Sequence, residues 1–393
     1  MSNFFITFLY ELLEYKDATG KNLTQDEVWT EITWSMYWLQ EGVHPDRCSN
    51  NIPYTCGMLK ELAKEPLAEG YFGVMWVLMG DLDYMHKVMH FADFNKPSEP
   101  CSLCRANNTD VPWTDFRLLQ AIWVLRGWSN LDYKIAKGDS LHRILRHIPG
   151  LGVNNYIPDI MHSKHLGPDK SLAGSTLKNL THHVMPDGPA KNLKALFREV
   201  QNEYRKEKTS SRFGAITERM IHSSTKRIPE LRGKAAQIRD LIPILAALWE
   251  KKMDMSLAHH RDVLAALKSS AAIDEILHDY RGHYIFPEHV RAQFRQHCFD
   301  YSTCVTALIQ HYHPAIPLYN ITTKNHAMAH LGLIASFINP NLGARWQGED
   351  MMRHLRTLAH SVTYGNPPAR AQVKAMEKYA MAIGYEFSVG SRI

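Results

Sequence analysis

The amino-acid sequence predicts an α/β (α+β) protein in which a strand-containing core is interrupted by a large, mainly helical block. Two apolar runs rich in aromatic and β-branched residues, 71–79 and 153–157, are expected to form strands. From about residue 190 to residue 310 the apolar side chains recur with helical spacing, and strand patterns are almost absent. Two closing helices are expected at 348–361 and 368–383. The strands therefore belong to the first 160 residues or so, and helices dominate the rest.

Start and stop signals mark several of these helices. Thr24 and Glu27 have the spacing of a capping box, and Gly42 can end the helix that they begin. Asp115 is expected to cap a helix over 116–127, and a further helix is expected to end near His147. The predicted segments are an N-terminal helical region (1–66), a first part of the core (67–185), a helical insertion that is basic at its start (186–312), and a C-terminal part of the core with the closing helices (313–393).

The composition is that of an ordinary globular protein of 393 residues, long enough for two or three domains or one large enzyme core. The apolar stretch 1–17 carries Glu11 and Glu14 and has no basic start, so it predicts an amphipathic helix rather than a signal peptide. No apolar run reaches transmembrane length. Six cysteines in so long a chain do not form a disulfide framework, which predicts a reducing compartment.

Positive charge is concentrated between Lys191 and Arg239. This segment holds 13 Lys and Arg against 5 Asp and Glu, a local charge of +8, whereas the whole chain carries +5 and the remainder therefore −3. A basic segment on a nearly neutral body predicts a polyanionic partner such as DNA. The alternative is an ordinary solvated helical face. The candidate DNA-binding residues are Lys191, Lys194, Arg198, Arg205, Lys206, Lys208 and Arg212.

Carboxylates follow both predicted strands. Asp81, with Asp83 as its alternate, comes after the first apolar run, and Asp159 comes after the second. Acids on neighbouring elements are what a two-metal phosphoryl-transfer site needs to hold Mg²⁺ or Mn²⁺. For the third acid we favour Glu349, at the start of a late helix, with Asp350 beside it as alternate. Turn and helix-cap roles are the alternative explanation for all of these acids.

A zinc site is predicted around Cys101 and Cys104, because a Cys-x-x-Cys turn after a proline supplies half of a tetrahedral ligand set. The remaining ligands are expected among four histidines that the sequence does not rank: His162, His165, His326 and His330. Cys298 and Cys304 are spaced six apart in a helical stretch and are expected in the core.

Several of these motifs carry a family resemblance. Residues 156–162 (YIPDIMH) resemble the second-acid motif of eukaryotic DDE/D cut-and-paste transposases. The upstream WVLMGDLDYM and PCSLC are similar to the strand, acid and CxxC order of the CACTA (En/Spm) transposases and their KDZ and Plavaka-like relatives, and 324–330 resembles their later His-rich segment. The resemblance implies a ribonuclease H-like core with a CxxC zinc-knuckle loop, structural Zn²⁺, catalytic Mg²⁺ or Mn²⁺, and cleavage and transfer of DNA at transposon ends. It further implies a nuclear location, homo-oligomers and no membrane partner.

Two other functions stay open at this level. No separate DNA-binding domain is recognisable ahead of the first acid and no distinctive motif marks the third acid, so the alternative expectation is a truncated or domesticated copy that acts as a zinc-stabilised DNA-binding protein. An HD-type metal phosphohydrolase is the other alternative, suggested by His259-His260 and His278-Asp279 in the helical block. That alternative leaves both acidic strand ends and the CxxC unexplained.

Overall fold

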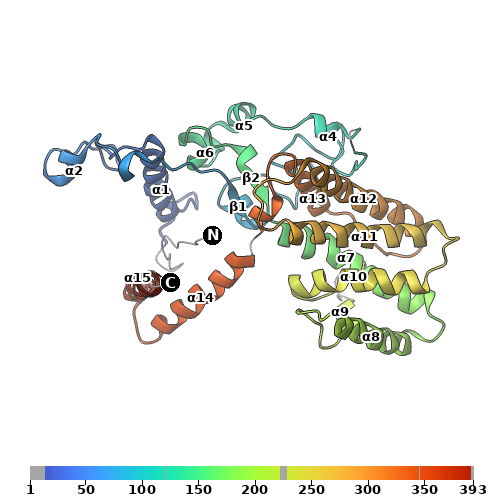
Figure 1. Ribbon diagram of the computed structural model, residues 1–393. Helices are drawn as coiled ribbons and strands as arrows, with labels where there is room; N and C mark the ends of the chain where they lie inside the picture. Colours follow the sequence, from blue (N-terminus) through green and yellow to red (C-terminus); the bar gives the residue numbers. More distant parts are fainter. Residues whose placement is uncertain (1–13, 119, 222–227, 345, 391–393) are drawn as a thin grey trace. The chain divides into compact units, whose positions relative to one another are not determined.

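A computed structural model of the protein describes residues 14–118, 120–221, 228–344 and 346–390 (Figure 1). The described residues form two compact units. Unit 1 takes its residues from the ranges 1–76, 143–151 and 345–393, and unit 2 from 77–142 and 152–344. The four predicted segments are stretches of sequence, whereas both units combine stretches that are distant in the chain. The helix expected within 1–17 lies almost entirely outside the described residues.

Unit 1 is built from helices. Its elements are α1 (Leu23–Glu41), α2 (Gly57–Leu62), the 3₁₀ turn η2 (Ala68–Gly70), α6 (Arg143–His147), α14 (Trp346–Thr363) and α15 (Pro368–Gly390). Helix α1 packs on α6, and α14 packs on α15. Gly42 ends α1 in the left-handed conformation, as predicted, with φ of 71°. The predicted capping box is wrong: Asn22 caps α1 by accepting the Gln25 amide, and Thr24 Oγ1 instead accepts the Tyr15 amide.

Unit 2 carries the strands and most of the helices. Its elements before the second strand are β1 (Leu78–Gly80), α3 (Leu82–Lys87), α4 (Ile122–Leu125), α5 (Asn130–Lys137), η3 (Gly138–Ser140) and η4 (Val153–Asn155). They are followed by β2 (Tyr156–Pro158), the π-helical turn η5 (Met161–His165), α7 (Pro168–Asn179), η6 (Leu180–Val184), α8 (Pro189–Lys206), α9 (Glu218–Ile221), α10 (Ala235–Lys252), α11 (Ala258–Asp279), α12 (Glu288–Tyr312), α13 (Thr323–Ile334) and η7 (Pro340–Gly343).

The sheet of unit 2 is small. Strands β1 and β2 pair in parallel, with Leu78 opposite Tyr156 and Gly80 opposite Pro158. The two predicted strands are therefore neighbours, but both are shorter than expected. Residues 71–76 form no strand, and Tyr71, Phe72 and Trp76 are largely exposed, because an apolar run becomes a buried strand only where other elements cover it. Val153–Asn155 is a 3₁₀ turn instead of strand.

Helices bury most of the core of unit 2. Helices α10, α11 and α12 lie side by side, α7 packs on α10 and α11, and α13 joins α12 to β2 (Figure 1). The helical block predicted over 190–310 and the closing helices are thereby confirmed, while 315–322 contains no strand. Helix α8 is amphipathic. One face buries Leu193, Leu196, Val200 and Tyr204, and its charged residues lie on the other face.

The helix predicted over 116–127 is mostly absent. Among the described residues of this range only Ile122–Leu125 is helical, and the Asp115 carboxylate binds the side chain and the amide of Arg117 rather than capping a long helix. The surrounding segment is a loop closed by a bridge between Cys104 and Gly127. The protein is thus helix-rich α+β, and the single sheet among its described residues has two strands. None of the described helices is both long and apolar enough to span a bilayer.

Candidate metal centre

Four side chains of unit 2 converge as a Cys₂His₂ group: Cys101, Cys104, His326 and His330. One ligand atom from each lies within 4.8 Å of all the others. Cys101 Sγ is 3.4 Å from His330 Nε2, and Cys104 Sγ is 3.3 Å from His326 Nε2. The two Nε2 atoms are 3.2 Å apart, and His330 Nε2 also lies 3.3 Å from Cys104 Sγ. The sulfur and nitrogen atoms therefore surround one point.

These distances match the edges of a zinc tetrahedron. Bonds of about 2.3 Å to sulfur and about 2.0–2.1 Å to nitrogen place S and N about 3.5 Å apart and two N atoms about 3.3 Å apart. The observed separations are 3.2–3.4 Å. Two thiolates and two imidazoles are also the donors that Zn²⁺ prefers in structural sites. The group fits a structural Zn²⁺ with no open coordination position.

Local sequence explains how each half of the centre forms. His326 and His330 are separated by four residues, so α13 presents both on one face. On the other half, the Leu103 amide donates to Cys101 Sγ at 3.3 Å. The His326 Nδ1 atom lies 3.1 Å from the Trp113 carbonyl, which orients the ring so that Nε2 faces the cysteines. The buried Trp123 ring packs against both imidazoles, with centroids 4.4 and 4.9 Å away.

The electrostatics of the centre favour the ligand forms of Cys101 and His326 but the protonated thiol of Cys104. Burial by itself raises the pKa of the Cys101 thiol, but the hydrogen bond with Cys104 and the charge of His330 outweigh burial and hold it well below its usual range. Burial and the neighbouring Cys101 raise the pKa of Cys104. Burial lowers the pKa of His326, which favours the neutral imidazole that a metal requires. A cation between the two thiols would release the proton that Cys104 keeps in its absence.

His162 and His165, the other two predicted zinc ligands, lie elsewhere. They belong to η5, the turn that follows Asp159. His162 Nδ1 contacts the Asp159 carboxylate three residues earlier, and His165 Nδ1 lies 3.1 Å from Asp169 Oδ2. The helical turn brings each histidine to the nearest carboxylate in the sequence, so neither side chain is directed at the cysteines. Of the four histidines that the sequence leaves unranked, the Cys₂His₂ group takes His326 and His330.

Two predicted catalytic acids follow the paired strand ends directly. Since Gly80 is opposite Pro158, Asp81 and Asp159 leave the same edge of the sheet. Both carboxylates, together with Cys101, add to the burial that raises the pKa of Tyr156. Asp81 caps α3 by accepting the Tyr84 amide at 2.7 Å. Asp159 has no exposed surface and accepts the Met161 amide at 3.1 Å.

The other predicted acids differ in position. Asp83 is exposed on α3 and pairs with Lys87 at 2.8 Å. Glu349 and Asp350 are part of α14, in unit 1, but their side chains lie outside the described residues. The third acid therefore stays a prediction.

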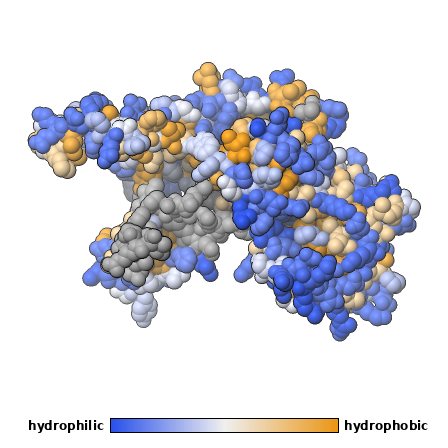
Figure 2. Space-filling view, in the orientation of Figure 1, coloured by the Kyte–Doolittle hydropathy of each residue, from blue (hydrophilic) through white to orange (hydrophobic). Residues whose placement is uncertain are grey.

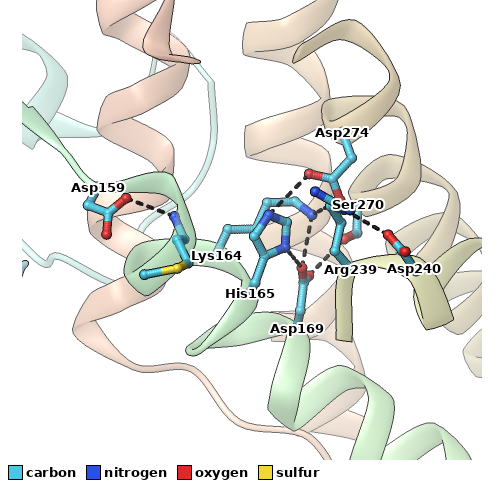
Figure 3. Close-up of polar contacts among 9 residues, drawn as sticks. Asp159, Lys164, His165, Asp169, Arg239, Asp240, Ser270 and Asp274 are labelled. Atoms are coloured by element: carbon cyan, nitrogen blue, oxygen red, sulfur yellow. Dashed lines mark hydrogen bonds and ion pairs between the residues drawn. The ribbon is translucent and has the colours of Figure 1, made fainter. Parts of the chain in front are cut away.

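A buried charge cluster, which sequence analysis missed, lies just beyond Asp159 (Figure 3). Lys164 Nζ is 2.9 Å from Asp169 Oδ2 and 2.6 Å from Asp274 Oδ2, and its side chain is fully buried. His165 Nε2 lies 3.4 Å from Asp274 Oδ1, and Ser270 Oγ donates to Asp169 Oδ1 at 2.7 Å. The cluster fastens η5 to α7 and α11. The spacing of Lys164 and Asp169, five residues apart, could have indicated one ion pair of the cluster. Asp274 could not be found in this way, because it is 110 residues from Lys164.

His165, Asp169 and Asp274 are close enough together to hold a metal ion. However, the Lys164 ammonium already contacts both carboxylates, so the lysine supplies the positive charge that a metal would bring. Burial by itself raises the pKa of Asp169, but the charge of Lys164 and the hydrogen bond with His165 outweigh it and lower the pKa to about 2. Similarly, the charges of Asp169 and Asp274 outweigh burial and raise the pKa of Lys164.

The predicted DNA-binding residues are exposed on or just after α8, and Figure 2 shows a hydrophilic surface over this helix. Lys191, Lys194, Arg198 and Arg205 recur at intervals that share one helical face. Lys191 pairs with Asp187, and Lys206 pairs with Glu203 and Glu207. Arg205 donates to Asn202 Oδ1. Lys208 and Arg212 follow the helix, where Arg212 donates to the Thr209 carbonyl.

The two doublets of the phosphohydrolase alternative, His259-His260 and His278-Asp279, lie at opposite ends of α11. His259 and His278 are 19 residues apart in one helix, which corresponds to about 28 Å at 1.5 Å per residue. His259 stacks on His311, with ring centroids 3.9 Å apart, and takes no part in a shared site with His278. The doublets therefore do not converge as an HD-type site requires.

Comparison with known proteins adds no relative: no protein-family model, no curated protein and no solved structure matches the chain.

Proposed function

We propose that this protein is a transposase-like protein that cleaves and joins DNA strands by a DDE/D mechanism. The observation that carries the proposal is the parallel pairing of β1 with β2, which brings Asp81 and Asp159 to the same sheet edge. The order of strand, acid, CxxC loop, second acid and helical block supports it, because this is the order of the CACTA, KDZ and Plavaka-like transposases that the sequence resembles. A ribonuclease H-like core, a nuclear location and assembly into homo-oligomers belong to the same proposal.

In this mechanism the chain mainly positions oxygen ligands. Asp81 and Asp159 supply carboxylates from adjacent strand ends, and Glu349, or Asp350 beside it, is assigned from sequence as the third. Carboxylate oxygens are the donors that Mg²⁺ and Mn²⁺ prefer, so the pair fits such an ion. When bound, the metal would lower the pKa of the attacking oxygen and offset the charge of the leaving one. Asp159 has no exposed surface, so the η5 turn must open for this role.

The Cys₂His₂ centre has a structural role in the proposal. It links the loop after α3 to α13, and α13 packs directly on β2 and on η5. A Zn²⁺ held there would fix the strand that precedes Asp159 and the turn that follows it. The zinc ligands and the catalytic acids are therefore separate sets of residues with connected scaffolds.

A second candidate function is a catalytically inactive, transposase-derived protein that binds DNA. Three contacts favour it: Asp81 Oδ1 accepts the Tyr84 amide as a helix cap, and Asp159 is buried against His162 and the Met161 amide. Such bonds are what purely structural carboxylates make. In this case the zinc centre and the basic face of α8 would carry the function, and the acids would only stabilise the fold.

A nicking assay separates the two functions. We expect wild-type protein to nick end-containing DNA with Mg²⁺ or Mn²⁺, and we expect Asp81→Ala and Asp159→Asn to lose nearly all turnover while still binding DNA. Asparagine keeps the acceptor for the Met161 amide, so Asp159→Asn tests charge rather than folding. Asp83→Ala is the matched control, because Asp83 pairs with Lys87 on the surface. If the wild type nicks no DNA with either metal, the catalytic proposal is wrong and the DNA-binding function remains. If Asp83→Ala were inactive and Asp81→Ala active, the first catalytic carboxylate would be Asp83 instead of Asp81.

The basic face of α8 gives a separate expectation for DNA binding. Reversing Lys194, Arg198 and Arg205 to Glu should weaken binding to any DNA sequence, because these exposed cations would contact phosphates. Each lost phosphate contact should also reduce the slope of log K against log salt by about 0.9. Titrations at several salt concentrations measure both quantities. Lys60→Glu, a single charge reversal at an exposed position of α2, is the control for a change of charge away from α8. An unchanged slope in the α8 variant would make this face an ordinary solvated surface.

A further inference from the structure

A groove opens beside the zinc centre, between the loop 98–109 and helix α5. Its volume is about 570 Å³, within the range of about 300–1,000 Å³ that is typical of ligand pockets. Arg105, Asn108, Trp128 and Lys137 are among the side chains that line it. Neither the zinc centre nor the acidic strand ends need this groove for the roles assigned to them above.

Stacked cations and aromatic rings form the wall of the groove. The Arg105 guanidinium carbon lies 4.2 Å from the centroid of the Trp128 ring. Trp128 meets Tyr133 edge to face, with centroids 5.7 Å apart, and Lys137 Nζ lies 5.8 Å from the Tyr133 centroid. Arg105 is exposed and its guanidinium lies over the Trp128 ring, so the side of this group away from Trp128 can meet a ligand.

The zinc-binding loop holds this wall in place. Arg105 is the residue after the ligand Cys104, and its amide donates to the Arg126 carbonyl at 3.0 Å. The Trp128 amide donates to the Leu103 carbonyl at 3.0 Å, and its indole Nε1 donates to the Cys104 carbonyl at 3.1 Å. The stacked pair is therefore fixed by the same backbone that presents the metal ligands, and a ligand would meet a preformed surface.

We propose that this groove binds single-stranded DNA, with a base stacked on the outer face of Arg105 and the neighbouring phosphate near Lys137. Arginine planes and aromatic rings are the platforms on which unpaired bases stack, and a nearby cation attracts the backbone. Acidic neighbours fit this orientation: Asp132 lies 3.9 Å from Arg105, and exposed Glu99 lines the groove, so a neutral base is favoured over a phosphate at the Arg105 end. The choice of DNA rests on the proposed function, and the groove would hold a strand exposed during cleavage or transfer.

Binding of a labelled oligonucleotide of about 12 nucleotides, within the site sizes of single-strand binders, tests the inference. Anisotropy is measured without Mg²⁺ or Mn²⁺ and without chelator, so that no cleavage occurs and zinc stays bound. We expect Arg105→Ala to weaken single-strand binding by about 10-fold and Trp128→Ala by at least as much. Arg105→Lys should restore little, because lysine keeps the charge but loses the stacking plane. Binding of a matched duplex should change by less than about twofold, since a duplex has no unstacked base to offer.

Arg126→Ala is the control, because Arg126 is an exposed arginine that bonds to Arg105 through its backbone carbonyl and whose side chain is not part of the groove lining. Zinc content and the thermal unfolding midpoint are measured for every variant. If Trp128→Ala proves unstable, Arg105→Ala still tests the inference, because it changes only an exposed side chain. Failure of the wild type to bind the single strand would overturn the inference, as would equal losses for Arg105→Ala and Arg126→Ala. Because the assay reads binding alone, a protein that binds here without nicking DNA contradicts only the catalytic proposal.

Discussion

Replacing Cys104 with serine should remove the metal from the protein and destabilise unit 2. Cys104 is buried, and its sulfur lies 3.3 Å from the Nε2 atoms of both His326 and His330. Serine offers a poor ligand to Zn²⁺, and the free energy of zinc binding is also folding free energy, on the order of 10 kcal/mol for small zinc domains. In a unit with a large helical core we expect a smaller loss, about 3–5 kcal/mol, similar to loss of a native cross-link. Metal analysis should give about one Zn²⁺ per wild-type chain and almost none for Cys104→Ser.

The exposed Cys56 supplies the matched control for this experiment. Cys56→Ser removes a thiol from unit 1, outside the Cys₂His₂ group, and should change neither zinc content nor the unfolding midpoint. His330→Ala should resemble Cys104→Ser, whereas His162→Ala should keep its zinc, because His162 contacts Asp159 instead. Equal zinc in wild type and Cys104→Ser would contradict the metal centre.

Replacing Lys164 with methionine should cost about 3–5 kcal/mol of unfolding free energy, as expected when one partner of a buried ion pair is removed. The change leaves Asp169 and Asp274 facing each other without the ammonium that contacts both. Urea unfolding of the purified variant measures the loss. Lys268→Met is the control on α11: Lys268 pairs with Glu250 on the surface, where removal of an ion pair costs about 0–1 kcal/mol. Similar losses in both variants would refute a special role for the cluster.

The same cluster should make the wild type sensitive to acid. The pKa of Asp169 falls from an ordinary value of 3.8 to about 2 in the folded protein. A lowered folded-state pKa stabilises the fold above the ordinary pKa, and this contribution is lost as the pH falls from about 4 towards 2. The stability of Lys164→Met should change less over this pH interval than that of the wild type, because the charge that lowers the pKa of Asp169 is gone. Unfolding midpoints measured across this pH range check the difference.

Local patterns in the sequence were enough for features that depend on nearby residues. The helical block, the closing helices and the Gly42 helix end follow from spacing within a few turns, and they are present in the structure. The half-sites of the metal centre are also local, since Cys101 and Cys104 share one turn and His326 and His330 share one helix face. Acids directly after two apolar runs likewise identified the neighbouring strand ends.

Tertiary structure decided what depends on partners distant in the chain. The first strand is Leu78–Gly80, shorter than predicted, because only those residues pair with β2, while the aromatic run before it is exposed. Which histidines join the cysteines could not follow from spacing, because α13 comes more than 200 residues after the CxxC turn and η5 commits His162 and His165 to nearby carboxylates. The Lys164 cluster needed Asp274 from α11. The sequence by itself thus determined the helical block, the closing helices, the acidic strand ends and the two halves of the metal centre. Tertiary packing determined that the CxxC turn meets α13 and that Lys164 meets Asp274, because the partner of a buried charge or metal ligand is the group that the fold brings within contact distance.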